Sequence, residues 1–264
     1  MKTQLIHGDC LEEMKKIPDG SVDLTVTSPP YDNLRTYNGN NALWSESVWK
    51  SIIEELYNVT KPGGVVVWVV GDATIKGSET GTSFKQALWA KECGFNLHDT
   101  MIWYKTNPMP YIKKDTYTPA FEYMFVWSKG KLKTHNLIRV PSKYAGKILK
   151  THTTNPESIR KANKTKPTLP TKIGHNVWSI VVAGTNYGHP AIFPEKIAHD
   201  HIISWSNEGD TVLDPFMGSG TTGKLAKQLN RNFIGIELDK DYFNIAKERI
   251  EKVQNKSEQL IIRE

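Results

Sequence analysis

Residues 22–31 read VDLTVTSPPY, an apolar run followed at once by Ser28, Pro29, Pro30 and Tyr31. The apolar run, residues 22–26, predicts a buried strand of a parallel sheet. The four residues after it are therefore expected at the carboxyl edge of the sheet, where open α/β sheets bind ligands. Two prolines in succession fix two φ angles and remove two N–H donors, so the turn is stiff.

This turn offers a hydroxyl, a carbonyl and an aromatic face to a planar ring that carries an exocyclic amine. The Ser28 hydroxyl and the Pro29 carbonyl can each accept one N–H of the amine, while Tyr31 stacks on the ring. Accepting both N–H bonds outside the ring plane frees the nitrogen lone pair for attack. An ordinary turn after a strand is the structural alternative, so the motif needs its context.

Length and composition predict a globular protein with one large domain or two small ones. The chain has 264 residues and 38% hydrophobic content, and it contains no run of the ~18 apolar residues that a membrane span needs. The first residues enter a predicted strand almost at once, so no signal peptide is expected. Cys10 and Cys93 lack disulfide or metal-ligand spacing. We therefore expect a cytoplasmic protein without a metal site.

Basic residues are concentrated in one internal stretch. The net charge is +6, and residues 129–175 hold 12 of the 34 Lys and Arg against one acid, Glu157. This stretch carries +11 and the remainder −5. A single basic region favours a polyanionic partner, of which nucleic acid is the commonest, over a merely solvated lysine-rich loop.

Strand and helix patterns alternate along most of the chain, which predicts a doubly wound α/β sheet. The pattern fails over residues 128–188, where Lys, Thr, Asn and Pro cluster around one apolar patch at 177–182. This predicts an inserted module or extended loops over 128–188. Elsewhere, residues 71–82 are predicted to form a glycine-rich loop. The expected strands are 4–9, 22–26, 65–70, 97–104, 121–127, 210–214 and 233–237, and the expected helices are 10–17, 44–60, 83–93, 195–205, 221–229 and 242–253.

A second motif lies near the other end of the chain. Residues 211–222 read TVLDPFMGSGTT, which predicts a strand, a glycine-rich turn and the start of a helix. Glycines at 218 and 220 let a ligand approach the backbone, and the helix start offers unpaired N–H groups. Glu237 then ends the next predicted strand, where an acid can bind ribose hydroxyls.

A dinucleotide site is the competing interpretation, because Gly218, Gly220 and Gly223 satisfy the G-x-G-x-x-G spacing. Asp214 at the strand tip argues against it, because a carboxylate there would lie near the phosphates. The same acid suits the cationic amino-acid end of S-adenosylmethionine. A nicotinamide enzyme would also leave the motif at 28–31 without a role.

Together the two motifs resemble those of the DNA amino-methyltransferases, which methylate an exocyclic nitrogen with S-adenosylmethionine. The catalytic motif comes first and the cofactor motif late, an order similar to that of the circularly permuted β group of the family. The resemblance covers most of the chain and is weakest over 129–188. It implies a Rossmann-like methyltransferase fold with S-adenosyl-L-methionine as cofactor.

The resemblance also implies roles for individual residues. Ser28, Pro29, Pro30 and Tyr31 match the catalytic motif, and residues 189–194 are similar to the segment before a helix that packs against the cofactor. Asp9 matches an acid near the adenine and Glu237 the acid on the ribose, and a capping or turn role is the alternative for Asp9 and for His189. The matched residues of the methionine and adenine pocket are Asp214, Phe216, Gly218, Ser219, Gly220 and Thr221.

The implied reaction is a direct methyl transfer to a base flipped out of the duplex. It relies on positioning and electrostatics, and it needs no cysteine nucleophile. Serine at the first motif position is typical of cytosine-N4 enzymes, and aspartate or asparagine of adenine-N6 enzymes. Ser28 therefore favours cytosine N4 over adenine N6. An RNA methyltransferase and a non-catalytic DNA-binding subunit are the remaining alternatives.

The resemblance divides the chain into three parts. Residues 1–128 form the catalytic half of one methyltransferase domain, 129–188 a basic target-recognition region, and 189–264 the cofactor-binding half. Double-stranded DNA is the expected partner, a homodimer and a separate cognate restriction endonuclease are candidates, and the expected origin is bacterial or phage. The expected DNA-binding residues are Lys143, Lys147, Lys150, Arg160, Lys161, Lys164, Lys166 and Lys172.

Overall fold

The computed structural model describes residues 1–30, 44–110, 116–148, 167–182 and 194–253. The chain divides into two compact units, of which the smaller is Leu137–His175 and the larger is the rest. The smaller unit lies within the expected region 129–188. Residues 129–136 and 176–182, at the two ends of that region, belong to the larger unit.

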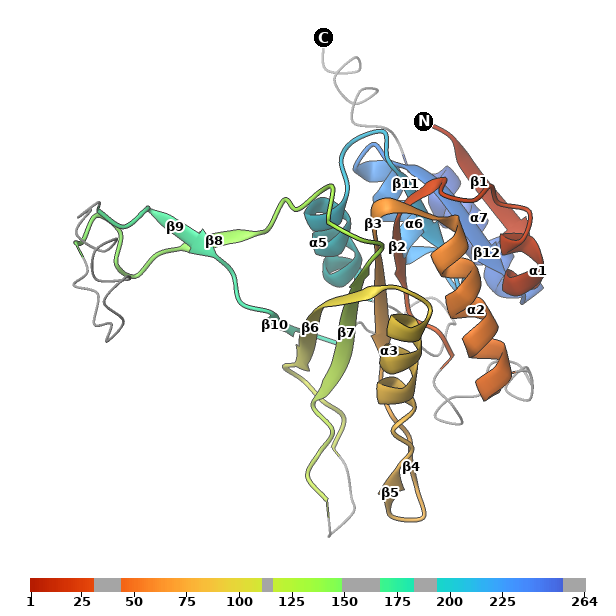
Figure 1. Cartoon of the computed structure of the whole chain (residues 1–264), viewed down its shortest axis with the longest axis horizontal. Coiled ribbons are helices and arrows are strands. Elements are labelled where there is room, and N and C mark those ends of the chain that lie inside the picture. The colour runs from red at the N-terminus through yellow and green to blue at the C-terminus, as the bar shows by residue number, and fades with distance from the viewer. Residues whose placement is uncertain (31–43, 111–115, 149–166, 183–193, 254–264) are drawn as a thin grey trace. The chain divides into compact units, whose positions relative to one another are not determined.

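The larger unit is built on one eight-stranded sheet in the order β1-β12-β11-β2-β3-β7-β6-β10 (Figure 1). Every pairing is parallel except the two made by β7, which is antiparallel to both β3 and β6. All strands other than β7 therefore run in the same direction and end at one carboxyl edge. The strands are β1 (Thr3–His7), β2 (Val22–Thr27), β3 (Thr60–Val70), β6 (Asn96–Lys105), β7 (Phe121–Ser128), β10 (Val177–Ile180), β11 (Thr211–Asp214) and β12 (Asn232–Glu237).

Helices cover both faces of this sheet, as the alternation along β3 shows. Val65, Val67 and Val69 pack in one core with the helices α5, α6 and α7, whereas Trp68 and its neighbours of even number pack in a second core with α1, α2 and α3. The doubly wound architecture expected from the sequence is therefore present. The helices are α1 (Cys10–Met14), α2 (Glu46–Val59), α3 (Thr82–Glu92), α5 (Glu195–Trp205), α6 (Thr221–Gln228) and α7 (Lys240–Glu251).

Two segments differ from the expectation. The loop expected at 71–82 contains a short hairpin, β4 (Thr74–Ile75) paired with β5 (Ser78–Glu79). The apolar patch at 177–182 supplies β10, which joins the main sheet because Val177–Ile180 pair with Ile102–Lys105 of β6. These three strands have two to four residues each, too few for sequence periodicity to reveal them.

The smaller unit is organised by one antiparallel pair, β8 (Arg139–Pro141) with β9 (Thr171–Ile173). The Arg139 guanidinium reinforces the pair by donating to the Thr171 hydroxyl at 2.9 Å and to its carbonyl at 2.8 Å. None of its described residues, 137–148 and 167–175, is buried. These described residues therefore lie outside both cores of the sheet.

Two asparagines fix the chain at the boundaries of the smaller unit. The Asn136 side-chain amide donates to the Ser206 carbonyl and to the Asn207 side chain, at 3.3 and 3.1 Å. The Asn176 amide donates to the Asp99 carboxylate at 3.1 Å. Both asparagines belong to the larger unit, so the chain leaves and re-enters the sheet at defined points.

Among the residues described here, no helix has both the length and the apolar character needed to cross a membrane.

Candidate active site

The two predicted motifs meet at the centre of the carboxyl edge. β2 and β11 are adjacent parallel strands, with Leu24 opposite Val212 and Thr25 opposite Leu213. From β2 the chain crosses through α2 to β3 on one side, and from β11 it crosses through α6 to β12 on the other. These two connections run in opposite directions along the sheet, so the boundary between β2 and β11 is a topological switch point. Doubly wound sheets bind their ligands at such points.

Ser28, Pro29 and Pro30 follow directly from the last residue of β2. Pro29 is buried, whereas Ser28 and Pro30 are partly exposed. Ser28 and Pro30 therefore follow β2 at the carboxyl edge and keep part of their surface accessible. Tyr31 lies outside the described residues.

Asp214, the last residue of β11, is 4% exposed and is held by hydrogen bonds. Its carboxylate accepts from the Thr27 hydroxyl at 2.7 Å and from the Phe216 amide at 3.2 Å. Burial raises the pKa of Asp214 to about 6, although these bonds act in the opposite direction. The carboxylate therefore joins the end of β2 to the glycine-rich turn.

The glycine-rich turn needs its glycines for two separate reasons. Gly218 and Gly220 have φ angles of 52° and 80°, which side chains disfavour. A Cβ on Gly220 would also lie 2.9 Å from the Cβ of Ala246, because α7 packs directly on the turn. The turn is thus shaped by the helix behind it.

Arg249 of α7 holds the same turn from behind. Its guanidinium donates to the Ser219 carbonyl at 2.5 Å and to the Ser219 hydroxyl at 2.8 Å. It also lies 3.6 Å from Glu195, the first residue of α5, which pairs with Lys224 of α6 at 2.6 Å. One ionic network therefore ties the turn to the starts of two helices. Sequence reasoning missed Arg249, although its i+3 spacing from Ala246 places it on the buried face of the helix.

Glu237 ends β12 beside the turn, as expected. Its two carboxylate oxygens accept from the amides of Gly218 at 2.7 Å and Asp239 at 2.9 Å. Burial raises the pKa of this carboxyl, opposed by the hydrogen bonds from these amides. Each carboxylate oxygen can accept a further bond, so the residue can still bind a hydroxyl pair.

Asp9 follows β1, whose last residue His7 pairs with Glu237. It is the N-cap of α1, and its carboxylate accepts from the amides of Leu11 at 3.0 Å and Glu12 at 3.1 Å. The capping role left open by the sequence is therefore present. It places the carboxylate at the same edge as Glu237.

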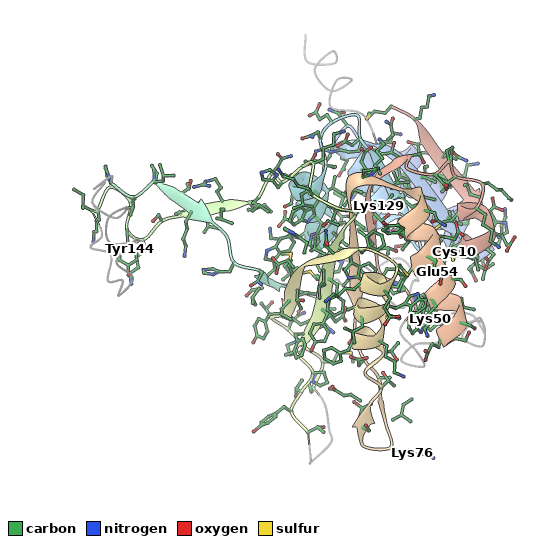
Figure 2. The ribbon with its side chains drawn as sticks, in the orientation of Figure 1. Cys10, Lys50, Glu54, Lys76, Lys129 and Tyr144 are labelled. Atoms are coloured by element: carbon green, nitrogen blue, oxygen red, sulfur yellow. The ribbon has the colours of Figure 1, made fainter. Side chains whose placement is uncertain are left out.

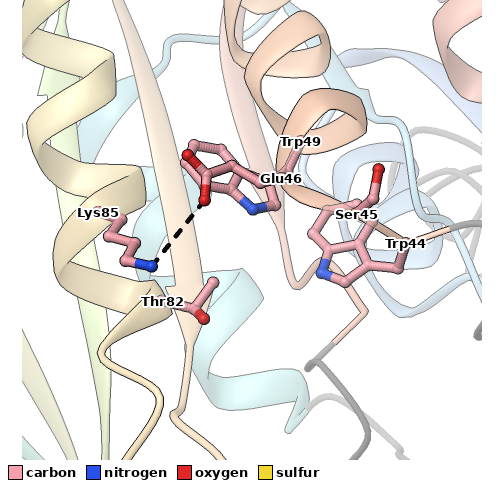
Figure 3. Close-up of a pocket in the computed structure, with 6 residues that line it drawn as sticks. All are labelled: Trp44, Ser45, Glu46, Trp49, Thr82 and Lys85. Carbon is pink, nitrogen blue, oxygen red and sulfur yellow. Dashed lines mark ion pairs between the residues drawn. The ribbon is translucent and has the colours of Figure 1, made fainter.

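Phe216 is part of an aromatic group that the sequence did not predict. Its ring makes edge-to-face contacts with Trp44 and Trp68, at centroid distances of 5.6 and 6.2 Å. Trp44 in turn lines a pocket between the first turns of α2 and α3, together with Trp49, Thr82 and the Glu46–Lys85 ion pair (Figure 3). Aromatic surface therefore extends from the glycine-rich turn towards these two helices.

Thr221, the first residue of α6, has a buried hydroxyl for which the described structure offers no hydrogen-bond partner. Buried polar groups are normally paired, so a hydroxyl of this kind next to a glycine-rich turn fits a site completed by a ligand.

The thiols of Cys10 and Cys93 play no such part. Burial raises the pKa of Cys10 to about 12 and that of Cys93 to about 11. Both stay protonated at neutral pH.

The structure describes three of the eight expected DNA-binding residues. Lys143, Lys147 and Lys172 lie in the smaller unit, and all three are exposed. The others, Lys150, Arg160, Lys161, Lys164 and Lys166, lie outside the described residues, as do residues 189–193 of the segment before α5. In the described part of the chain, no three His, Cys, Asp or Glu residues are grouped as a metal site requires.

The family model for DNA methylases (N6_N4_Mtase) matches residues 22–248, which contain both motifs. The chain belongs to the DNA methylase family. Orphan methyltransferase M.BamHII of Bacillus amyloliquefaciens is 52% identical to this DNA methylase over 248 residues, which cover 89% of this chain and 91% of the relative. Type II methyltransferase M.HpaI of Haemophilus parainfluenzae is 31% identical and aligns with 97% of this chain and 76% of its own.

Solved structures resemble this DNA methylase over nearly its full length. The M1.HpyAVI–SAM complex is 27% identical with a TM-score of 0.62, and covers 94% of this chain and 98% of its own. PvuII DNA methyltransferase (cytosine-N4-specific) has a TM-score of 0.72 and covers 97% of this chain and 88% of its own. At 22% identity, the second likeness concerns the fold alone.

Proposed function

We propose that this DNA methylase transfers a methyl group from S-adenosylmethionine to N4 of a cytosine flipped out of duplex DNA. The observation that carries the proposal is that β2, which Ser28 follows, is the direct neighbour of β11, which ends at Asp214. Methyl acceptor and methyl donor are thereby expected on adjacent strands of one edge. S-adenosylmethionine supplies an electrophilic methyl group on a sulfonium centre.

The residues of the glycine-rich turn fit the parts of this donor. Ionised Asp214 would attract the amino group, and Glu237 would accept from the ribose hydroxyls. The Thr221 hydroxyl, which lacks a protein partner, and the backbone at Gly218, Ser219 and Gly220 would complete the pocket. Phe216 would cover its apolar side, and Asp9 would lie towards the adenine.

At the acceptor, the Ser28 hydroxyl and the Pro29 carbonyl would accept the two N–H bonds of the target amine. This orients the nitrogen lone pair towards the methyl carbon, and Tyr31 would stack on the ring. The N–CH₃ bond forms as the S–CH₃ bond breaks, and the surplus proton of the amine passes to solvent. Catalysis comes from orientation and exclusion of water, which can supply several kcal/mol, roughly 7–11 in favourable cases.

The choice of cytosine rests on Ser28, and adenine N6 is the second candidate. Both targets present an amine with two N–H donors on a flat ring, so the pocket accepts either in principle. The experiment is mass spectrometry of nucleosides from unmethylated duplex DNA incubated with the protein and S-adenosylmethionine. N4-methylcytosine supports the proposal, and N6-methyladenine overturns the choice of base. No methylated nucleoside would favour an RNA substrate or a non-catalytic subunit.

The smaller unit is proposed as the target-recognition part, with the expected region 129–188 around it. None of its described residues is buried, and the exposed Lys143, Lys147 and Lys172 present positive charge, which suits a phosphate backbone. Four further expectations stay predictions, namely a homodimer, a cognate endonuclease, the circular permutation and the cytoplasmic location. Replacing the three lysines by glutamine should lower the salt dependence of DNA binding, and an unchanged slope would place the DNA surface elsewhere.

A further inference from the structure

The β4–β5 hairpin is a feature that the proposed reaction does not use. It follows the end of β3, with Thr74 opposite Glu79 and Ile75 opposite Ser78. Figure 1 shows it projecting beyond the carboxyl edge of the sheet, and Figure 2 shows Lys76 at its tip. Residues 75–79 are all exposed.

The tip adopts a conformation that the packing of the protein does not impose. Lys76 and Gly77 have φ angles of 50° and 82°, as a tight two-residue hairpin turn requires. Left-handed backbone is unfavourable for lysine, which has a Cβ. A Cβ placed on Gly77 would meet nothing within 4 Å, so the turn stands in open space. The two-residue turn itself accounts for these angles, and it leaves Lys76 exposed at the tip.

The base of the hairpin, by contrast, is firmly held. The Asp72 carboxylate accepts from the Thr80 hydroxyl at 3.2 Å, from the Ser83 amide at 2.9 Å and from the Ser83 hydroxyl. The Thr80 amide donates to the Ala73 carbonyl at 2.9 Å. Lys76 therefore lies on a hairpin whose base is fixed by hydrogen bonds. This limits the conformational entropy that the loop loses when Lys76 binds a partner.

The β4–β5 hairpin follows β3, the strand next to β2. β3 is the parallel neighbour of β2, with Thr27 opposite Trp68, so Ser28 and the residues that follow Val70 leave the sheet at the same edge. A duplex that delivers a flipped base to Ser28 must approach this edge, and its backbone carries one negative charge per ~1.7 Å of axis. We propose that Lys76 contacts a backbone phosphate of the substrate DNA beside the flipped base. This inference rests on the proposed function.

The test compares Lys76→Gln with Lys91→Gln in the intact protein. Lys91 is an exposed lysine in the last turn of α3, the end of that helix away from the carboxyl edge. Binding of duplex DNA is measured at several salt concentrations, along with methylation at saturating DNA. Lys76→Gln should lower the slope of log K against log salt by about 0.9, the loss of one phosphate contact. Lys76→Arg should restore it, and Lys91→Gln should match the wild type.

The outcomes separate this inference from the proposed function. If the wild type methylates DNA and Lys76→Gln keeps the wild-type slope, the phosphate contact is wrong while the methyltransferase stands. If the wild type methylates no DNA, the proposed function fails first. A lower slope with unchanged affinity for S-adenosylmethionine supports the contact, because a general loss of folding would lower both.

Discussion

The hydroxyl of Thr27 donates to the carboxylate of Asp214 over 2.7 Å, joining the last residue of β2 to the last residue of β11. A second bond runs beside it, from the Thr222 hydroxyl to the Val26 carbonyl at 3.3 Å. These bonds tie the strand that carries Ser28 to the turn expected to hold the methyl donor. A displacement of either motif therefore disturbs the other, although they lie almost 200 residues apart in the sequence.

The raised pKa of Asp214 predicts a pH dependence of cofactor binding. Only the ionised carboxylate attracts the amino group of S-adenosylmethionine, so affinity should be high above pH 6 and fall as the pH drops through about 6. Calorimetric titration between pH 5 and 8 measures this. Thr27→Val removes a bond that lowers the pKa, so its midpoint should lie at higher pH. Asp214→Asn should flatten the profile, and a dependence that survives it would assign the effect to another group, such as Glu237.

Arg249→Met should weaken S-adenosylmethionine binding by roughly tenfold, about 1.4 kcal/mol. The guanidinium is expected to act through Ser219, which it bonds, so turnover at saturating cofactor should change far less than KM. Lys252→Gln is the control, because the Lys252 side chain forms an exposed pair with Glu248 on the same helix. Arg249→Lys should recover part of the affinity. An equal loss in Arg249→Met and Lys252→Gln would show that the effect is not specific to the turn.

Gly220→Ala and Gly209→Ala should differ, although both glycines have nearly the same φ, 80° and 85°. A Cβ at Gly209 meets nothing within 4 Å, whereas a Cβ at Gly220 lies 2.9 Å from Ala246. Gly209→Ala should therefore cost only the backbone strain, about 1–2 kcal/mol. Gly220→Ala should cost ~1–3 kcal/mol more through overpacking. Chemical denaturation measures both, and equal losses would mean that α7 yields to the added methyl group.

His201 predicts a loss of stability in acid. It is fully buried in α5, with its ring 4.5 Å from that of Trp178, and burial lowers its pKa to about 3 against the attraction of Asp200. Since the unfolded chain takes up the proton near pH 6.5, this group's contribution is complete above that pH. It declines as the pH falls from 6.5 towards 3. His201→Phe should unfold at lower pH than the wild type, and an unchanged acid midpoint would assign acid unfolding to other groups.

Sequence reasoning succeeded where a pattern extends over a whole element. The apolar run at 65–70 gave the centre of β3, and the helical spacing at 195–205 gave the bounds of α5. Both motifs were expected at the carboxyl edge, because in a parallel sheet the residue after any strand lies there. The structure adds that the two motifs are on neighbouring strands, which depends on strand order.

Features fixed by a few long-range contacts were missed. Arg249 reads as one more charged residue of a surface helix until Ala246 and Ile250 are seen against the glycine-rich turn. β10 is a four-residue strand whose assignment depends on its pairing with β6. The β4–β5 hairpin is mainly polar, and Lys76 replaces the asparagine or aspartate that usually marks such a turn.

The contacts of Asn136 and Asn176 have a consequence for the evolution of this protein. The described residues between them are exposed or partly exposed and lie outside both cores, whereas both anchoring residues are bonded to the sheet unit. We therefore expect that these described residues can be exchanged or diversified with little effect on the free energy of folding of the sheet. Selection for new ligands can act there without endangering the enzyme that carries it.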